Sequence, residues 1–179
     1  MIISRNITAA AFTIAALAAM TVPAAAHISL TTKEAVVGST FKAVLVAAHG
    51  CGGKATTALR VQIPEGFYNV KPMPKAGWEV KTVTGPYATP FENHGTTLTE
   101  GVTEVSWSGG ELPDDQFDEF VFRGTFGGAL EAGSTFYFPV IQICGDEEDA
   151  WIDTSGDPEA ELPAPSVSLT PAEASGHHH

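Results

Sequence analysis

Apolar and polar residues alternate in short runs along the chain after residue 26. The alternation is clearest where Phe120, Phe122 and Phe126 fall on one face of a predicted strand. Gly, Pro and Asp clusters separate such runs, and no helical periodicity persists beyond about two turns. The runs cover residues 27–31, 40–48, 58–63, 67–71, 78–83, 102–107, 117–126, 135–143 and 166–170. The pattern predicts an antiparallel β-sandwich or barrel.

The first 26 residues have a different pattern. Arg5 precedes an uncharged apolar stretch that ends in Ala24-Ala25-Ala26. This order predicts a secretory signal peptide over residues 1–26, because the stretch is short for a membrane span and no basic cluster follows it. Residues 27–170 would then form one exported domain, and residues 171–179 a mobile tail ending in three histidines. We expect the mature protein to be periplasmic, at the cell surface or secreted, and not embedded in a membrane.

The composition of the chain excludes some classes of binding partner. The chain has 179 residues, of which 44% are apolar, so it can build one core. It has 21 acidic and 9 basic residues, and its net charge of −12 argues against nucleic acids and anionic membranes. Its two cysteines, Cys51 and Cys144, favour one disulfide in an exported chain; a two-thiol Cu(I) site is the alternative. Such a bridge would hold His49 close to residues 144–151.

The predicted cleavage site supplies a candidate metal ligand. Cleavage after Ala26 would place His27 at the new N-terminus. Its α-amine and its imidazole Nδ1 can then bind one ion together, and the amine loses its proton readily because its pKa is about 8. Nitrogen donors suit Cu(II), which stands at the top of the divalent affinity series. His27 is therefore a candidate copper ligand.

The order and spacing of several short segments indicate a relationship to a known family. These segments comprise His27 with residues 34–39, 49–51 with 55–57 and 61–66, then 71–78, 105–110, 117–120, and 142–144 with 151–153. Together they resemble the YcnI-like family of exported copper-binding domains, from His27 to about Thr170. The resemblance implies an all-β, antiparallel β-sandwich, immunoglobulin-like or cupredoxin-like, that binds Cu(II) at its mature N-terminus.

The resemblance also implies a ligand set. In that family the terminal histidine supplies its amine and imidazole, a carboxylate adds a ligand and a tryptophan lies against the metal. His27 matches the histidine and Trp151 matches the tryptophan. The family's glutamate position falls within residues 49–51, which contain no acid. We therefore infer that His49 replaces the carboxylate.

Other side chains are also candidates for the ligand position that the family's glutamate occupies. Asp153 would share the face of Trp151 on a strand, and Glu147 and Glu148 lie close to it in the chain. We include Asp153 with His27, His49 and Trp151 in the predicted metal site. His94 lies in a polar segment and Met73 between two prolines, and both are weaker candidates.

These observations predict an exported copper-binding protein that takes part in copper trafficking or buffering. We expect its partners to be other exported copper proteins or copper transporters, with no small-molecule substrate and no catalytic residues. One alternative is a terminal-histidine copper oxidase that attacks polysaccharides, with His49 as its second histidine. Another is an adhesive or structural sandwich without metal. The common hydrolase, zinc-protease and phosphate-loop motifs do not occur in the sequence.

Overall fold

The structure is a computed structural model that describes residues 27–172. These residues form strands and turns without an α-helix, so none of their segments is a helix able to cross a membrane. The predicted signal peptide and the three terminal histidines lie outside the described residues.

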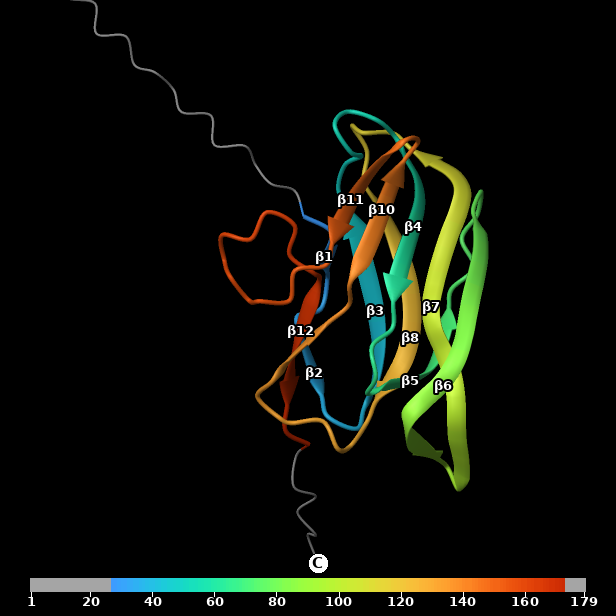
Figure 1. The fold of residues 1–179 in the computed structure, drawn as a ribbon, viewed down its shortest axis with the longest axis vertical. Coiled ribbons are helices and arrows are strands. Elements are labelled where there is room, and N and C mark those ends of the chain that lie inside the picture. The colour runs from blue at the N-terminus through green and yellow to red at the C-terminus, as the bar shows by residue number, and fades with distance from the viewer. Residues whose placement is uncertain (1–26, 173–179) are drawn as a thin grey trace, which may run out of the picture.

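Two β-sheets face each other, and a third, smaller sheet lies beside them (Figure 1). The first sheet has the order β1 (Ser29–Leu30), β3 (Thr40–Ala47), β8 (Asp118–Phe126) and β5 (Phe67–Pro72). The second has the order β11 (Glu147–Trp151), β10 (Val140–Cys144), β4 (Thr56–Gln62), β7 (Thr96–Leu112) and β6 (Glu79–Asn93). The third contains β2 (Glu34–Val36), β12 (Ser166–Thr170) and β9 (Thr135–Tyr137). The predicted all-β sandwich is confirmed.

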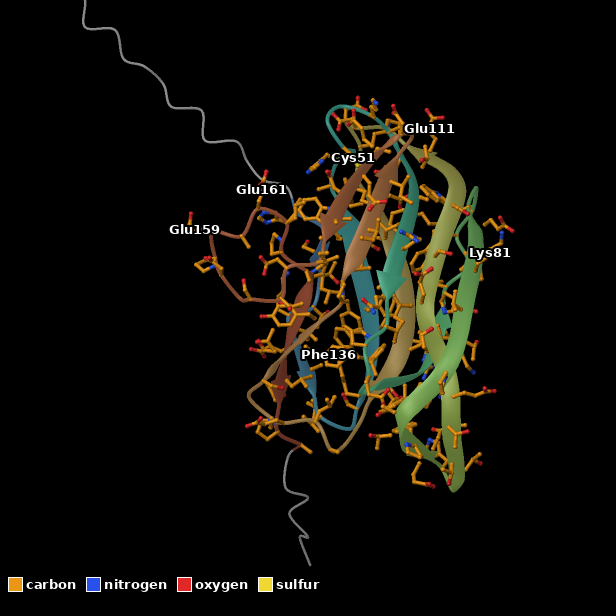
Figure 2. The ribbon with its side chains drawn as sticks, in the orientation of Figure 1. Cys51, Lys81, Glu111, Phe136, Glu159 and Glu161 are labelled. Carbon is orange, nitrogen blue, oxygen red and sulfur yellow. A yellow bond between two sulfur atoms is a disulfide. The ribbon has the colours of Figure 1, made fainter. Side chains whose placement is uncertain are left out.

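The core lies between the two large sheets. Phe120 of β8 meets Trp107 of β7 across the interface, with ring centroids 5.6 Å apart. Phe122 and Phe126 continue the buried face of β8, as the alternation predicted. Figure 2 shows the side chains on the ribbon; Phe136 is part of the core, whereas Lys81 is exposed to solvent. Burial of one face of each strand is the main source of stability in this architecture.

Several elements differ from the sequence-based expectation. The predicted strands 78–83 and 102–107 are parts of β6 and β7, which form a much longer hairpin. The predicted strand 135–143 is divided into β9 and β10 at Phe138 and Pro139, because proline has no N–H for a strand ladder. Two strands, β2 and β11, were not predicted, since both are short and each fully buries only one residue. The predicted strand 166–170 is β12, which lies between a parallel β2 and an antiparallel β9.

Strand pairing decides which residues meet at one end of the sandwich. Strand β1 pairs with the end of β3, with Ser29 opposite Val46, so the chain before β1 runs towards the loop after β3. In the other large sheet, Trp151 at the end of β11 pairs with Val140 of β10. Strands β1 and β11 are edge strands of facing sheets, and they lie near each other in Figure 1.

Candidate metal centre

Two histidine rings lie close to the ring of Trp151. Its ring centroid lies 5.7 Å from that of His27 and 6.5 Å from that of His49, and both contacts are edge-on. Trp151 is buried, whereas both histidines are partly exposed to solvent. The three residues come from different segments: the start of the described chain, the loop after β3 and the end of β11. The structure thus brings together three of the four residues of the predicted site.

The ring of His49 is oriented by its own loop. Its Nδ1 hydrogen-bonds the carbonyl oxygen of Gly50. A carbonyl oxygen only accepts, so Nδ1 is the donor of this hydrogen bond. A hydrogen bond of this kind at one ring nitrogen is typical of histidines that bind metal through the other.

Gln142 of β10 connects Trp151 with the loop that carries His49. Its side chain is buried, and its carbonyl oxygen accepts the indole N–H of Trp151 at 3.0 Å. Its amide nitrogen donates to the backbone carbonyl of His49 at 2.7 Å and to the hydroxyl of Thr56 at 2.8 Å. A buried amide with its groups satisfied in this way holds its partners in one arrangement. Gln142 therefore positions both Trp151 and the His49 loop.

The loop between β3 and β4 closes through a two-residue turn. Cys51 and Lys54 exchange backbone hydrogen bonds of 3.1 and 2.9 Å across Gly52 and Gly53, whose φ angles are 56° and 86°. Positive φ at both central positions defines a type I′ turn, which favours glycine. Gly50 is also required, because a Cβ there would lie 1.7 Å from the carbonyl oxygen of Lys54. The glycine-rich sequence therefore folds the loop back tightly beside His49.

Long-range links fasten this loop to the rest of the sandwich. The predicted disulfide is confirmed: Cys51 and Cys144 are joined with a Cα–Cα distance of 5.7 Å. The Lys54 ammonium pairs with Asp146 at 2.6 Å and with Glu147 at 2.9 Å. The hydrogen bond to Lys54 holds the pKa of Asp146 below its usual value, and the same contacts raise the pKa of Lys54.

Asp114 adds a further link from a different part of the chain. Its carboxylate accepts the backbone N–H of Gly50 at 3.0 Å, although 64 residues separate the two. Nothing in the sequence around Asp114 indicated this contact. Together with the disulfide and the ion pairs, this contact makes the position of His49 a product of tertiary structure.

The comparisons with known proteins place the domain in a family. A family described as a domain of unknown function, DUF1775, matches residues 27–169. The chain belongs to the DUF1775 family. This is the YcnI-like family whose resemblance the sequence segments indicated. The description of the family assigns no function, so membership supports the relationship alone.

A solved structure shares the fold of this DUF1775 domain. It is described as an uncharacterized protein from Nocardia farcinica with an immunoglobulin-like fold. The similarity has a TM-score of 0.59 at 23% identity and covers 80% of this chain and 98% of the other. At this identity the comparison supports the immunoglobulin-like sandwich and nothing finer. No curated protein matches this chain.

The acidic candidates of the DUF1775 domain have other contacts. Asp153 is exposed just beyond β11, where its carboxylate accepts the N–H of Ser155 at 2.7 Å. Hydrogen bonds with the side chain of Ser155 and then with its backbone N–H lower the pKa of Asp153. The backbone of Asp153 pairs with Leu162 and Ala164 to close the loop after β11. Glu147 pairs with Lys54. Within residues 27–172, no three His, Cys, Asp or Glu side chains gather as a metal cluster, so Asp153 does not complete one with His27 and His49.

The weaker candidates lie away from Trp151. His94 is exposed in the turn between β6 and β7, with a φ of 50°, at the far end of the long hairpin in Figure 1. Met73 is 49% exposed after β5. The positioning role of Gln142 was not predicted. The available signal was its place two residues before Cys144, on an otherwise apolar strand.

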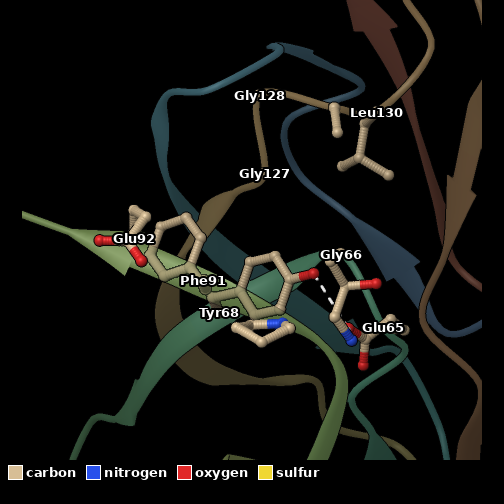
Figure 3. Close-up of a pocket in the computed structure, with 11 residues that line it drawn as sticks. Glu65, Gly66, Tyr68, Phe91, Glu92, Gly127, Gly128 and Leu130 are labelled. Carbon is tan, nitrogen blue, oxygen red and sulfur yellow. Dashed lines mark hydrogen bonds between the residues drawn. The ribbon is translucent and has the colours of Figure 1, made fainter. Parts of the chain in front are cut away.

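A hollow of about 430 Å³ at the opposite end of the sandwich has a different lining. Tyr68 stacks on Phe91 there with centroids 4.5 Å apart, and its hydroxyl donates to Glu65 at 3.0 Å (Figure 3). Its lining includes Glu65 and Glu92 but no histidine or cysteine. It therefore lacks the nitrogen and sulfur donors that copper prefers.

Proposed function

We propose that this DUF1775 domain is an exported copper-binding protein that holds one Cu(II) ion at His27 and His49, beside Trp151. The observation that carries the proposal is the placement of both imidazoles against one buried tryptophan. Removal of residues 1–26 would add the α-amine of His27, giving three nitrogen donors in all. Nitrogen donors of this kind suit Cu(II). This donor set needs no third side chain.

The surroundings of the histidines support the proposal. The hydrogen bond between Nδ1 of His49 and the carbonyl oxygen of Gly50 orients the His49 ring, and Gln142 holds both the loop and the indole in place. The face of Trp151 would favour a nearby cation, an effect of roughly 0.5–2 kcal/mol depending on desolvation. We infer a role in copper trafficking or buffering between other exported copper proteins or transporters, because partly exposed ligands allow the ion to be exchanged.

The test compares two N-termini of the metal-free protein. One sample begins at His27, and the other carries an additional glycine before it. We expect one tightly bound Cu(II) in the first sample and at least a hundredfold weaker binding in the second, roughly 2.7 kcal/mol. Titration against a competing chelator measures the affinity, and the spin-resonance spectrum reports the nitrogen ligands. Equal affinities and spectra for the two samples would contradict the proposal.

A terminal-histidine copper oxidase is the second candidate, and the second imidazole beside Trp151 is the observation that favours it. An oxidase would produce peroxide from oxygen when copper-loaded protein is supplied with ascorbate. We expect less peroxide than from the same amount of free copper, because a storage or transfer site shields its ion. Turnover above that of free copper, lost in the sample with the additional glycine, would favour the oxidase.

A further inference from the structure

Three cationic side chains form a row on the outer face of the first sheet. Lys42 of β3 lies directly opposite Arg123 of β8, and Arg123 lies directly opposite Lys71 of β5. All three residues are exposed. Neighbouring strands are about 4.8 Å apart, so three positive charges cross the sheet within about 10 Å.

This arrangement is unfavourable for the isolated domain. Like charges directly opposite on neighbouring strands destabilise a sheet. The chain contains 9 basic and 21 acidic residues, so carboxylates outnumber the basic groups more than twofold. Nevertheless, within residues 27–172 no carboxylate pairs with any member of the row, whereas Lys54, Lys75 and Lys81 each form an ion pair. An uncompensated row of cations on an acidic protein indicates a ligand of opposite charge.

A hollow of about 290 Å³ lies beside the row. All three cationic residues line it, together with Pro72, Met73, Pro74, Val121 and Phe122. No acidic residue contributes to the lining. The backbone N–H of Met73 donates to the carbonyl oxygen of Val121 at 2.8 Å, which fixes the proline-flanked segment over β8 as one wall.

We propose that this hollow binds a small organic anion that carries two or three carboxylate or phosphate groups on a compact apolar body. The planar guanidinium of Arg123 can bind one oxyanion through two hydrogen bonds, with a lysine on each side for the remaining charge. The apolar wall and floor would contact the carbon skeleton. The size of the hollow suits a compact molecule better than an extended segment of a partner protein.

The proposed anion site does not depend on copper binding. Lys42 lies five residues before the end of β3, roughly 17 Å along the strand from the loop that carries His49. The experiment therefore uses metal-free protein beginning at His27, so that its outcome is separate from that of the copper titration. Backbone amide signals are followed by NMR at low ionic strength while citrate, and in a second series pyrophosphate, is added.

We expect saturable shifts confined to the amides around Lys42, Lys71, Met73 and Arg123, with a Kd below about 1 mM for at least one of the two anions. Arg123→Gln should weaken binding at least tenfold. Lys33→Gln removes the same charge at an exposed position outside the hollow and should leave the affinity within twofold. Because like-charge repulsion is relieved, Arg123→Gln should also raise the melting temperature by roughly 1–3 °C.

Three outcomes would overturn the proposal. The first is the lack of saturable shifts with either anion, and the second is equal weakening by Arg123→Gln and Lys33→Gln, which would indicate general charge attraction. The third is binding of a hexaglutamate peptide at this face while citrate and pyrophosphate have no effect, which would assign the face to an acidic protein partner. Lys42→Gln provides a second variant of the row if Arg123→Gln does not fold.

Discussion

At one end of the sandwich, the loop that carries His49 is fastened to β10 and β11 by the disulfide and by the ion pairs of Lys54. At the other end, Tyr68 stacks on Phe91, and Glu65 accepts hydrogen bonds from Tyr68 and from the backbone of β6. The partners at the first end are about 90 residues apart in the chain, whereas Glu65 and its partners are separated by 3 to 24 residues.

The two ends of the sandwich therefore differ in what their packing achieves. The Tyr68 end consists of stacked rings supported by nearby segments, which stabilises the long hairpin without gathering metal donors. The His49 end contains a buried polar side chain, Gln142, with three hydrogen-bond partners, and two histidines beside one tryptophan. Changes at the His49 end should therefore alter both stability and copper binding, and changes at the Tyr68 end should alter stability alone.

The disulfide should give the largest effect. Replacing both cysteines, Cys51→Ser with Cys144→Ser, opens a loop of 93 residues. We expect the free energy of unfolding to fall by about 4–5 kcal/mol on the chain-entropy relation, and copper affinity to fall because the His49 loop loses its covalent anchor. Urea unfolding and copper titration of the double variant measure the two effects. Copper affinity that is unchanged in the folded double variant would show that the loop is positioned without the bridge.

The matched change at the opposite end is Phe91→Ala. It removes the ring stacked on Tyr68, and we expect a loss of about 1–3 kcal/mol in the free energy of unfolding, because Phe91 is only partly buried. Copper affinity should stay within twofold of the unchanged protein. A parallel loss of copper affinity would break the distinction between the two ends.

Gln142→Leu should have the next largest effect at the His49 end. The leucine keeps much of the side-chain volume but leaves the Trp151 indole, the His49 carbonyl and the Thr56 hydroxyl without this partner. We expect a loss of about 3 kcal/mol in stability, since each buried unpaired group costs about 1–3 kcal/mol. Quenching of Trp151 fluorescence by Cu(II) should also weaken. Thr56→Val removes one of these partners and should cost about 1 kcal/mol while leaving the quenching intact.

His49→Ala isolates the second imidazole. Copper affinity should fall by about tenfold, or about 1.4 kcal/mol, and the spin-echo spectrum should lose one imidazole. His94→Ala is the control, because His94 lies in the turn between β6 and β7, outside the candidate site. Identical spectra for the protein before and after His49→Ala would remove His49 from the site and restrict the metal to His27.

The ion pairs of Lys54 should give the smallest effect, because these charges are exposed and screened by water. Lys54 lowers the pKa of Asp146 from 3.8, so this stabilisation is complete above that value and is lost as the pH falls through the lower, folded-state pKa. Lys54→Gln should therefore narrow the difference in melting temperature between pH 7 and pH 2. Lys81→Gln, which removes the exposed pair with Glu79, serves as the control.

The alternation of apolar residues was sufficient to predict the sandwich, because each strand needs one apolar face for the core. It also located most strands, including β3, β8 and β12. It did not extend β6 and β7 to their full length, since much of this hairpin is exposed and its residues follow no alternating pattern. Nor did it predict β11, where Trp151 is the one large apolar residue and pairing with β10 creates the strand.

Two features of the candidate site were determined by the sequence alone. Two cysteines in one chain allow a single intramolecular bridge, and that prediction is confirmed. The position of His27 directly after an A-x-A end is likewise a property of the linear chain, and copper binding there remains a prediction. Tertiary structure decided the remaining features: the contact of both histidines with Trp151, the role of Gln142, and the row formed by Lys42, Arg123 and Lys71. These features depend on strand register and on which polar groups are buried next to one another. Both are determined by pairing between residues that are far apart in the chain.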